Sequence, residues 1–332
     1  MIKAADYASD QDVRWCPGCG DYSILKQVQS VLADLSSQRE NTVFISGIGC
    51  SSRFPYYLNT YGMHGIHGRA TAIAAGLRSV RRDLDVWVIT GDGDGLSIGL
   101  GHLLHLLRRN IRLKILLFNN EIYGLTKGQY SPTTPEGHRT KSSPMGVIDH
   151  PFNPVSLSLG ADASFVARSV DRDPVHLRET LKAAHEHPGS ALVEIYQNCN
   201  VFNDGAFFAF TEKDKKANNT VQLQHGQPIT FGANDEYVLN MEKNRIVKAD
   251  AATCKTPLIH DEENLNQAWM LSRLFELPSD EMELPRPFGI FFREERPCYE
   301  DRLQEQIDTA RQKKGAPNLD ELLRGDTWWE VH

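Results

Sequence analysis

Four cysteines of this chain have neighbours that suit metal binding. Cys16 and Cys19 form a Cys-Pro-Gly-Cys turn, whereas Cys50 and Cys199 stand singly, in Gly-Ile-Gly-Cys-Ser and Gln-Asn-Cys-Asn. Because most of these sites follow an expected strand or lie in a glycine-rich turn, they can gather at one end of a sheet. Four converging thiolates bind zinc or an iron–sulfur cluster. A thioredoxin-like redox pair is a third interpretation of the first two, although Pro-Gly between them matches only in part.

The spacing of the cysteines bears on the choice between zinc and a cluster. Structural zinc sites usually contain two close Cys-x-x-Cys pairs, but here one pair is joined by two distant single cysteines. The glycines around Cys16, Cys19 and Cys50 leave backbone N–H groups free to donate to inorganic sulfides. Cys254 and Cys298 lack such surroundings and are expected to be free thiols. From these residues alone, zinc and a cluster both remain open.

A second group of residues suits a metal-bound diphosphate. The apolar run Val86 to Thr90 leads into Gly91-Asp92-Gly93-Asp94-Gly95, and 25 residues separate Gly93 from Asn119-Asn120, which end the next apolar run. Two adjacent strand ends can aim a carboxylate and an amide oxygen at one point. A hard cation such as Mg²⁺ prefers oxygen ligands of this kind, completed by a main-chain carbonyl, water and phosphate oxygens. The glycines allow the backbone to approach a diphosphate closely.

A parallel sheet is needed to position both groups. The pattern of apolar residues predicts strands over 42–48, 86–90, 113–118 and 191–196, and helices over 23–35, 69–82, 100–109 and 175–187. Short, nearly all-apolar strands that alternate with helices indicate an α/β fold, with a mostly parallel sheet covered by helices on both faces. Ligands of such sheets bind at the carboxyl ends of the strands, where the motifs lie.

The alternation of strands and helices fades after about residue 200. Residues 1–205 are expected to form the domain that carries both motifs, and 206–332 an irregular C-terminal extension with a helix near 300–313. The stretch 211–240 is polar and is expected to be irregular. Two interpretations of the extension stay open: an arm that packs on a partner chain, or a tail folded onto its own domain. The Pro-, Gly- and Ser-rich stretch 131–153 predicts a long loop, which in a compact domain is often functional.

Composition limits the class of protein. The 332 residues carry 36 Lys and Arg against 43 Asp and Glu, a net charge of −7, and 40% are apolar. This acidic balance argues against a nucleic-acid binder. No uncharged apolar run approaches the roughly 20 residues that span a bilayer, and the first residues lack the form of a signal peptide. We therefore expect a cytoplasmic protein, free of nucleic acid and membrane, whose cysteines are thiols or ligands.

The cysteine motif and the diphosphate motif, taken together in this order along the chain, resemble those of the β subunits of the 2-oxoacid:ferredoxin oxidoreductases. The matching stretches are WCPGCGDYSILK (15–26), GIGCSSRFPYYLNTYGMHGIHGRATAIAAGLR (47–78), GDGDGLSIGLGHLLHLLRRN (91–110) and NNEIYGLTKGQYSPTTPEG (119–137). The resemblance covers roughly residues 10–205. Its GIGCSSRFP and HGRA segments look most like the 2-oxoglutarate branch, and the region after about 240 matches no pattern of the family.

The resemblance implies the residues that hold the cofactors. A [4Fe–4S] cluster would be bound by Cys16, Cys19, Cys50 and Cys199. Thiamine diphosphate would be held through Mg²⁺ on Asp92, Asn120 and the main-chain oxygen of Ile122. The residues expected to border the thiamine cofactor are Ile48, Gly49, Cys50, Ser51, His67, Gly68, Gly93, Asp94, Gly124 and Leu125.

Two cations are candidates for the carboxylates of the substrate. Arg53 lies three residues after Cys50, and Lys127 follows Tyr123-Gly124-Leu125-Thr126. A forked guanidinium suits a carboxylate, although a surface ion pair is the alternative for each. Lys127 stands where a glycine would also suit. His64 is expected to be structural.

The resemblance also implies an activity. It is the CoA-dependent oxidative decarboxylation of 2-oxoglutarate to succinyl-CoA and CO₂, or the reverse reductive carboxylation, with electrons passing singly through the cluster to ferredoxin. An α subunit that carries the pyrimidine-binding domain would be required, in an (αβ)₂ assembly. One alternative is the same chemistry on pyruvate or another 2-oxoacid. An alternative of another class is a zinc-stabilised binding protein without catalysis.

Overall fold

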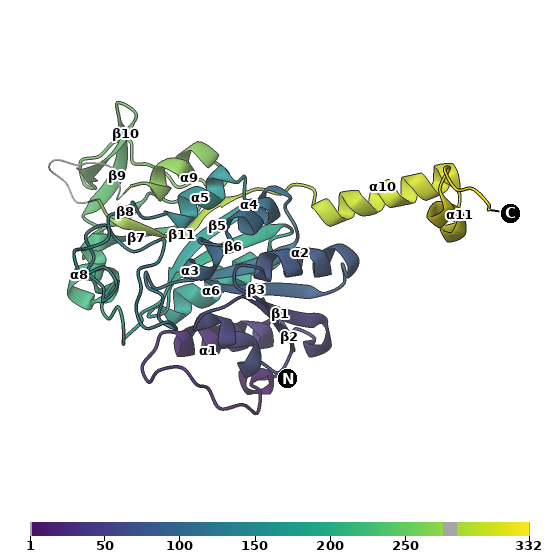
Figure 1. Cartoon of the computed structure of the whole chain (residues 1–332). Helices are drawn as coiled ribbons and strands as arrows, with labels where there is room; N and C mark the ends of the chain where they lie inside the picture. Colours follow the sequence, from purple (N-terminus) through teal and green to yellow (C-terminus); the bar gives the residue numbers. More distant parts are fainter. Residues whose placement is uncertain (1, 275–283, 332) are drawn as a thin grey trace.

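An eight-stranded sheet forms the centre of the molecule (Figure 1). The computed structural model describes residues 2–274 and 284–331, and its main sheet has the strand order β2-β1-β3-β4-β6-β5-β11-β7. The strands are β1 (Thr42–Ser46), β2 (Tyr61–His64), β3 (Asp85–Gly91), β4 (Leu113–Asn119), β5 (Phe165–Val170), β6 (Ser190–Tyr196), β7 (Thr220–Leu223) and β11 (Arg286–Arg293). The first six are parallel, whereas β11 is antiparallel to β5 and parallel to β7. The expected, mostly parallel sheet is confirmed.

Helices cover both faces of this sheet. The longer ones are α1 (Asp21–Asp34), α2 (Ala70–Val80), α4 (Leu100–Arg108), α6 (Pro174–Glu186), α9 (Leu265–Ser272) and α10 (Tyr299–Lys314). The short ones are α3 (Asp92–Gly95), α5 (Pro154–Gly160), α7 (Phe208–Thr211), α8 (Lys213–Asn219) and α11 (Leu319–Arg324), with 3₁₀ turns η1 (Ala4–Tyr7), η2 (Arg39–Asn41) and η3 (Ser51–Tyr57). Within the described residues, no helix combines the length and apolar character that crossing a bilayer requires.

Each face of the sheet has its own hydrophobic core. Along β3, Val86 and Val88 join the cluster that packs under α2, α4, α5 and α9, while Trp87 and Ile89 join the cluster under α1 and α6. Alternate side chains of a strand point to opposite faces, so an all-apolar strand must be covered on both. The apolar runs seen in the sequence follow from this arrangement.

A second, three-stranded sheet corrects one expectation. The prediction that residues 211–240 are irregular is wrong, because they contain α8, β7, β8 (Thr230–Phe231) and the start of β9 (Tyr237–Glu242), which pairs antiparallel with β10 (Arg245–Asp250). The hairpin turn between β9 and β10 is Lys243-Asn244, with φ of 47° and 63°. Turns of this left-handed form usually carry glycine, so the hairpin has little signal in the sequence.

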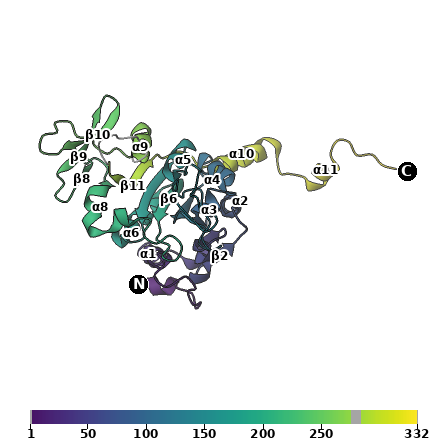
Figure 2. The same ribbon diagram turned by 60° about the vertical axis from the view of Figure 1, so that its left-hand side comes forward.

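The C-terminal region contains two strands of the main sheet and a projecting arm. Strands β7 and β11 lie in the main sheet, so the sheet extends across the boundary expected at residue 205. Helices α10 and α11 instead project from the body as an arm, as both ribbon views show (Figures 1 and 2). Part of the expected extension is therefore folded onto its own domain, and part is an arm. The stretch 275–283 lies outside the described residues.

A buried ion pair ties the C-terminal strand β11 to the sheet. Arg168 on β5 donates from Nε to Glu194 Oε2 on β6 at 2.7 Å, and both side chains are buried. Arg168 also donates to the carbonyl oxygen of Pro287 on β11 at 3.3 Å, and Asn119 on β4 donates to Glu194 Oε1 at 2.8 Å. The pair therefore connects four strands, including the one that ends in the Asn-Asn motif.

Replacing Glu194 by alanine is expected to destabilise the fold strongly. Breaking a buried pair by removing one partner leaves an uncompensated charge and typically costs about 3–5 kcal/mol. Urea denaturation should therefore show a clear fall in the free energy of unfolding. Asp83→Ala, which breaks the exposed Arg81–Asp83 pair, is the control and should leave the midpoint unchanged. Equal midpoints for the two variants would contradict the structural role of the buried pair.

Candidate active site at the carboxyl edge of the sheet

The two sequence motifs meet where β3 and β4 end. Gly91 on β3 is paired with Phe118 on β4, so Asp92 and Asn119-Asn120 leave the sheet side by side. Asp92 Oδ2 accepts hydrogen bonds from the hydroxyls of Ser131 and Thr133, each at 2.6 Å. The long loop predicted over 131–153 therefore covers the Asp92 carboxylate. Burial raises the pKa of Asp92, and these two hydroxyls lower it by less.

Asn120, at the end of the neighbouring strand, is held through both atoms of its amide. Its Oδ1 accepts the N–H of Ile122 at 3.2 Å, and its Nδ2 donates to Gln197 Oε1 at 2.9 Å. Gly93 packs under the same turn, because a Cβ at Gly93 would lie 2.3 Å from Tyr123 Cε1. The Tyr123 hydroxyl donates to the Gly93 carbonyl oxygen at 2.7 Å. The 119–129 turn is thus fixed against α3.

Asp94 connects three loops at this edge. Its Oδ1 accepts the N–H of Ile48 at 3.1 Å and of Gly68 at 2.7 Å, and His67 Nδ1 lies 2.7 Å from the same oxygen. Its Oδ2 accepts the Thr90 hydroxyl at 2.8 Å. The resemblance predicts Asp94 and His67 beside a diphosphate. In the structure the Asp94 carboxylate is engaged by the protein, so it positions the loops that carry the other predicted residues.

The four predicted cysteines come from three segments that pack together. Asn200 Nδ2 donates to the Pro17 carbonyl oxygen at 2.7 Å, which joins the Cys16–Cys19 turn to the turn of Cys199. Trp15 Nε1 donates to the carbonyl oxygen of Cys50 at 2.7 Å. Cys16 is exposed, and the other three are partly buried. The structure therefore brings together the three segments that carry the predicted cysteines.

Gly124 lies directly against two of these sulfurs. A Cβ at Gly124 would lie 3.5 Å from Cys199 Sγ and 3.6 Å from Cys50 Sγ. Gly124 belongs to the Asn-Asn-Glu-Ile-Tyr-Gly turn that begins at the end of β4. The cysteines and the Asp92–Asn120 motif are therefore parts of one site.

Cys19 and Cys50 lie where a free thiolate is strongly disfavoured. Burial, and next to it the charge of Asp21, raises the pKa of Cys19 far above its usual range, and raises the pKa of Cys50 to about 12. Burial raises the pKa of Asp21 itself to about 7. A bound metal is what normally holds buried cysteines as thiolates. Within residues 2–274 and 284–331, no group of three or more His, Cys, Asp and Glu is arranged to hold a single metal ion.

Sequence reasoning missed Gln197, which joins the two halves of the site. Its Oε1 accepts from Asn120, and its Nε2 donates to Cys19 Sγ at 3.2 Å and to the Asn198 carbonyl oxygen at 2.7 Å. The only signal in the sequence is its place directly after the strand that precedes Cys199. A buried amide with both a donor and an acceptor used suits this bridging position.

A cavity of about 570 Å³ opens beside the predicted cofactor residues. Its lining includes Ile48, Gly49, Arg53, His64 and Leu125. Arg53 is thus brought to the site, whereas Lys127 is exposed on the neighbouring turn and does not line this cavity. Lys127 has φ of 77°, a left-handed conformation that favours glycine.

His64 is held by the backbone, as expected for a structural residue. Its Nδ1 lies 3.0 Å from the Ser52 carbonyl oxygen and 3.1 Å from Ser46 Oγ. Cys298 lies at the opposite edge of the sheet, because its Sγ is 2.9 Å from the carbonyl oxygen of Pro188, which precedes β6. It is thus separate from the four predicted cysteines, in line with its expected role as a free thiol.

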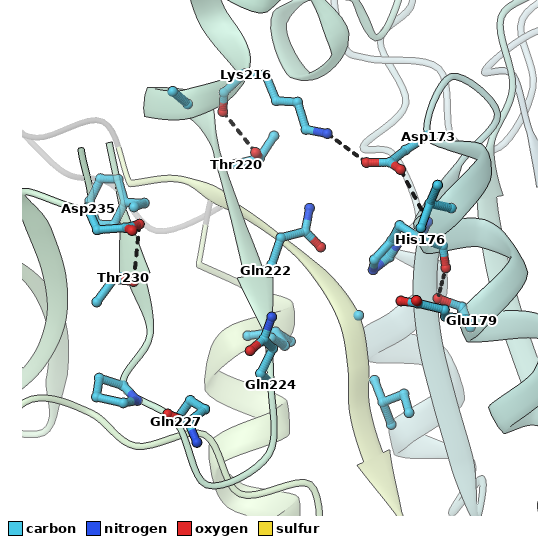
Figure 3. Close-up of a pocket in the computed structure, with 18 of the residues that line it drawn as sticks. Asp173, His176, Glu179, Lys216, Thr220, Gln222, Gln224, Gln227, Thr230 and Asp235 are labelled. Carbon is cyan, nitrogen blue, oxygen red and sulfur yellow. Dashed lines mark hydrogen bonds and ion pairs between the residues drawn. The ribbon is translucent and has the colours of Figure 1, made fainter. Parts of the chain in front are cut away.

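A larger cavity, of about 1040 Å³, lies away from these residues (Figure 3). It is bounded by α6, α8, β7 and the three-stranded sheet. Lys216 on its wall pairs with Asp173 at 2.7 Å, and the Thr220 hydroxyl donates to the Lys216 carbonyl oxygen at 2.8 Å. None of the residues predicted to bind a cofactor or substrate lines it.

Comparison with known proteins identifies the family. Residues 47–195 match the family described as thiamine pyrophosphate enzyme, C-terminal TPP binding domain. The chain is 54% identical over 333 aligned positions to the 2-oxoglutarate oxidoreductase subunit KorB of Mycobacterium tuberculosis, an alignment that covers 98% of this chain and 88% of the relative. The chain belongs to the β subunits of the 2-oxoacid:ferredoxin oxidoreductases. Its resemblance to the 2-oxoglutarate branch is confirmed.

Two further proteins support the assignment of the chain to this family. The 2-oxoglutarate synthase subunit KorB of Archaeoglobus fulgidus is 35% identical over 238 positions, covering 70% of this chain and 88% of the relative. A solved structure described as 2-oxoglutarate:ferredoxin oxidoreductase from Magnetococcus marinus with 2-oxoglutarate, coenzyme A and succinyl-CoA bound is 32% identical. Its TM-score is 0.76, and the match covers 97% of this chain and 94% of that one.

Asp94→Ala is expected to free the two loops that the carboxylate holds. Without an acceptor, the N–H groups of Ile48 and Gly68 lose their partner, which costs about 1–3 kcal/mol for each buried donor. Hydrogen exchange at these two amides should become about tenfold faster or more. Asp94→Asn keeps a carbonyl oxygen in place and should show a smaller change. Unaltered exchange in Asp94→Ala would contradict the positioning role.

Proposed function

We propose that this chain is the β subunit of a 2-oxoglutarate:ferredoxin oxidoreductase that works by CoA-dependent oxidative decarboxylation to succinyl-CoA and CO₂, or by the reverse carboxylation. The observation that carries the proposal is the closeness of Gly124 to Cys50 and Cys199, whose sulfurs lie 3.6 and 3.5 Å from the place that a Cβ of residue 124 would occupy. Through it, the turn that follows Asn120 lies directly beside the cysteine set. This adjacency is what one-electron oxidation at a thiamine centre requires, and an NAD-linked dehydrogenase has no need of it.

The residues at the β3 and β4 ends fit thiamine diphosphate held through Mg²⁺. Asp92 is a buried carboxylate with a raised pKa, and a cation beside it would offset the cost of burying its charge. Asp92, Asn120 and the Ile122 carbonyl would hold the ion. When bound, thiamine diphosphate supplies the electron sink for decarboxylation. The residues that would border it are Ile48, Gly49, Ser51, His67, Gly68, Gly93, Gly124 and Leu125.

The cysteine set fits a [4Fe–4S] cluster on Cys16, Cys19, Cys50 and Cys199. Support comes from the raised pKa of Cys19 and Cys50, since bound iron would supply the positive charge that stabilises their thiolates. When bound, the cluster supplies a one-electron acceptor. Gln197 donates to Cys19 Sγ, and such a hydrogen bond to a ligand sulfur tunes the potential of a cluster. We propose that ferredoxin approaches from the side of the exposed Cys16.

Arg53 is the better supported candidate for the substrate carboxylate. It lines the cavity beside Gly49, where a guanidinium can make two parallel hydrogen bonds. Lys127 remains a second candidate, on the turn that bears Leu125. The choice of 2-oxoglutarate is supported by the names of the two KorB relatives and by the 2-oxoglutarate and succinyl-CoA bound in the solved neighbour.

An α subunit is required to complete this enzyme. We propose that it supplies the pyrimidine-binding domain at the carboxyl edge, in an (αβ)₂ assembly that passes its electrons to a separate ferredoxin. We place the assembly in the cytoplasm, where thiols stay reduced.

The proposed function is tested by co-purifying this chain with its α chain and assaying viologen reduction, acid by acid. With CoA present, 2-oxoglutarate should give the highest kcat/KM, and omission of CoA should abolish steady turnover. Arg53→Lys should raise KM for 2-oxoglutarate more than about tenfold, because lysine lacks the forked guanidinium that can bind both carboxylate oxygens. Preference for pyruvate would move the assignment to another 2-oxoacid. A complex inactive on every 2-oxoacid would refute the function.

Cys199→Ser is expected to lose or convert the cluster. A serine replaces one thiolate, so iron and acid-labile sulfide per chain should fall, together with the broad visible absorption that dithionite bleaches. Cys298→Ser is the matched control, since Cys298 lies at the opposite edge, and its iron content should stay unchanged. Full iron and sulfide in Cys199→Ser would remove Cys199 from the ligand set. A colourless protein that contains zinc would favour the non-catalytic alternative.

A further inference from the structure

Two neighbouring side-chain amides, those of Asn120 and Gln197, have orientations that the main chain fixes. Asn120 Oδ1 accepts the N–H of Ile122 at 3.2 Å, so that its Nδ2 faces Gln197 Oε1 at 2.9 Å. Gln197 Nε2 donates to the carbonyl oxygen of Asn198 at 2.7 Å, and a carbonyl oxygen can only accept. Neither amide can therefore exchange its oxygen and nitrogen without losing a hydrogen bond to the main chain.

The hydrogen bonds of this amide pair all point in one direction. Asn120 Nδ2 donates to Gln197 Oε1, and Gln197 Nε2 donates in turn to Cys19 Sγ at 3.2 Å. Hydrogen bonds in such a series polarise one another, which strengthens each by roughly 10–30% inside a protein. Gln197 is only 1% exposed, so water does little to screen the effect. A change of charge at one end of the pair is therefore felt at the other end.

The Asn120 end of the pair can take a cation. The oxygen of an amide has two lone pairs, and the N–H of Ile122 uses one of those on Asn120 Oδ1. The other suits the Mg²⁺ that the proposed function places on Asn120. A cation there draws electrons away from the amide, so Asn120 Nδ2 becomes a stronger donor to Gln197, and Gln197 a stronger donor to Cys19.

The Cys19 end of the pair responds to negative charge. Hydrogen bonds to ionised acceptors are about twice as strong as those between neutral groups. A cluster bound through Cys19 would carry one more negative charge when reduced, and Gln197 Nε2 would donate more strongly to a sulfur that shares this charge. Gln197 therefore stabilises the reduced state, and does so more when Mg²⁺ has already polarised the pair.

We propose that Gln197 is a positioning residue that couples the thiamine site to the cluster site: Mg²⁺ and thiamine diphosphate bound at Asn120 make the cluster easier to reduce. The inference rests on the proposed function for the presence of both groups. Linkage requires that reduction of the cluster tighten the binding of thiamine diphosphate by the same factor. From the cooperative gain in bonds to charged groups we expect a factor of about three. The electron acceptor is thus readiest when the coenzyme that supplies the electrons is in place.

Asn203 offers a matched control, because it joins the same two loops in another way. Its Nδ2 donates to the carbonyl oxygen of Asn120 at 2.9 Å, and its N–H donates to the carbonyl oxygen of Cys199 at 3.0 Å. These contacts go to main-chain oxygens, whereas Gln197 contacts the Asn120 amide and the Cys19 sulfur. An effect of looser loops would appear in variants of either residue, but an effect of polarised amides only in variants of Gln197.

Redox titration of the intact αβ complex, prepared without oxygen, tests the coupling. The EPR signal of the reduced cluster gives the midpoint potential, with and without Mg²⁺ and thiamine diphosphate. The coenzyme should raise the potential by about 28 mV, the equivalent of a threefold change at about 59 mV per tenfold for one electron. An unchanged or lowered potential in a complex that binds both groups would overturn the coupling alone. A complex without iron, or one that does not bind thiamine diphosphate, would refute the proposed function as well.

Gln197→Met and Asn203→Ser assign the coupling to a residue. Methionine fills a similar volume without an N–H, so in Gln197→Met the coenzyme should no longer shift the potential. Asn203→Ser should keep the wild-type shift. A shift that persists in Gln197→Met, or that is lost in Asn203→Ser too, would overturn the role of Gln197.

Pulsed EPR of the wild-type complex gives a measurement that does not depend on how the variants fold. With ¹⁵N at the side-chain amide of glutamine, the reduced cluster should show coupling to one such nitrogen, and this coupling should grow when thiamine diphosphate binds. No coupling, or one that thiamine diphosphate leaves unchanged, would overturn the proposal.

Discussion

The side-chain amide of Gln197 is the contact on which the carboxyl edge depends. Its Oε1 accepts a hydrogen bond from Asn120, which belongs with Asp92 to the predicted magnesium motif. Its Nε2 donates a hydrogen bond to Cys19 Sγ. Gln197 is almost completely buried, so neither bond can be replaced by water without rebuilding the site. A buried polar group that lost one of these partners would cost about 1–3 kcal/mol. Residues 19, 120 and 197, distant in the sequence, are thereby held at one place.

The two edges of the sheet serve different purposes. The carboxyl edge gathers the thiamine motif, the cysteine set and the cavity of Arg53. The amino edge carries the buried Arg78–Glu300 pair, at the first turn of α10, and the arm. The C-terminal arm therefore leaves the body at the edge opposite the candidate site.

Much of the sheet could be predicted because its central strands are apolar and covered on both sides. Strand β5 escaped prediction because Arg168 interrupts its apolar run, and only the structure shows Glu194 neutralising that charge. Strand β11 contains Pro287 and Gly289, which usually argue against a strand inside a sheet. The exposed edge strand β2 offers no buried pattern at all. In each case tertiary contacts outweigh local preference.

The residues of the candidate site also differ in how far the sequence predicts them. Asp92, Asn120, Cys16, Cys19 and Cys50 have the spacing or the glycine-rich surroundings that indicate their chemistry, whereas Cys199 is indicated by its place after a strand. Gln197 has neither, since a lone glutamine after a strand is ordinary. Asp94 is predicted by its motif, but its hydrogen bonds to Ile48 and Gly68 arise only when loops from three strands converge. Sequence therefore reveals residues that recur in a motif, and the fold reveals those that hold the motifs together.

Anomalous diffraction at the iron edge, from crystals of the αβ complex grown without oxygen, tests the central claim most directly. We expect iron peaks enclosed by the sulfurs of Cys16, Cys19, Cys50 and Cys199, in contact with the Gly124 turn, and thiamine diphosphate on the Asp92–Asn120 side of that turn. A peak at the zinc edge among those sulfurs, or iron bound elsewhere, would contradict it.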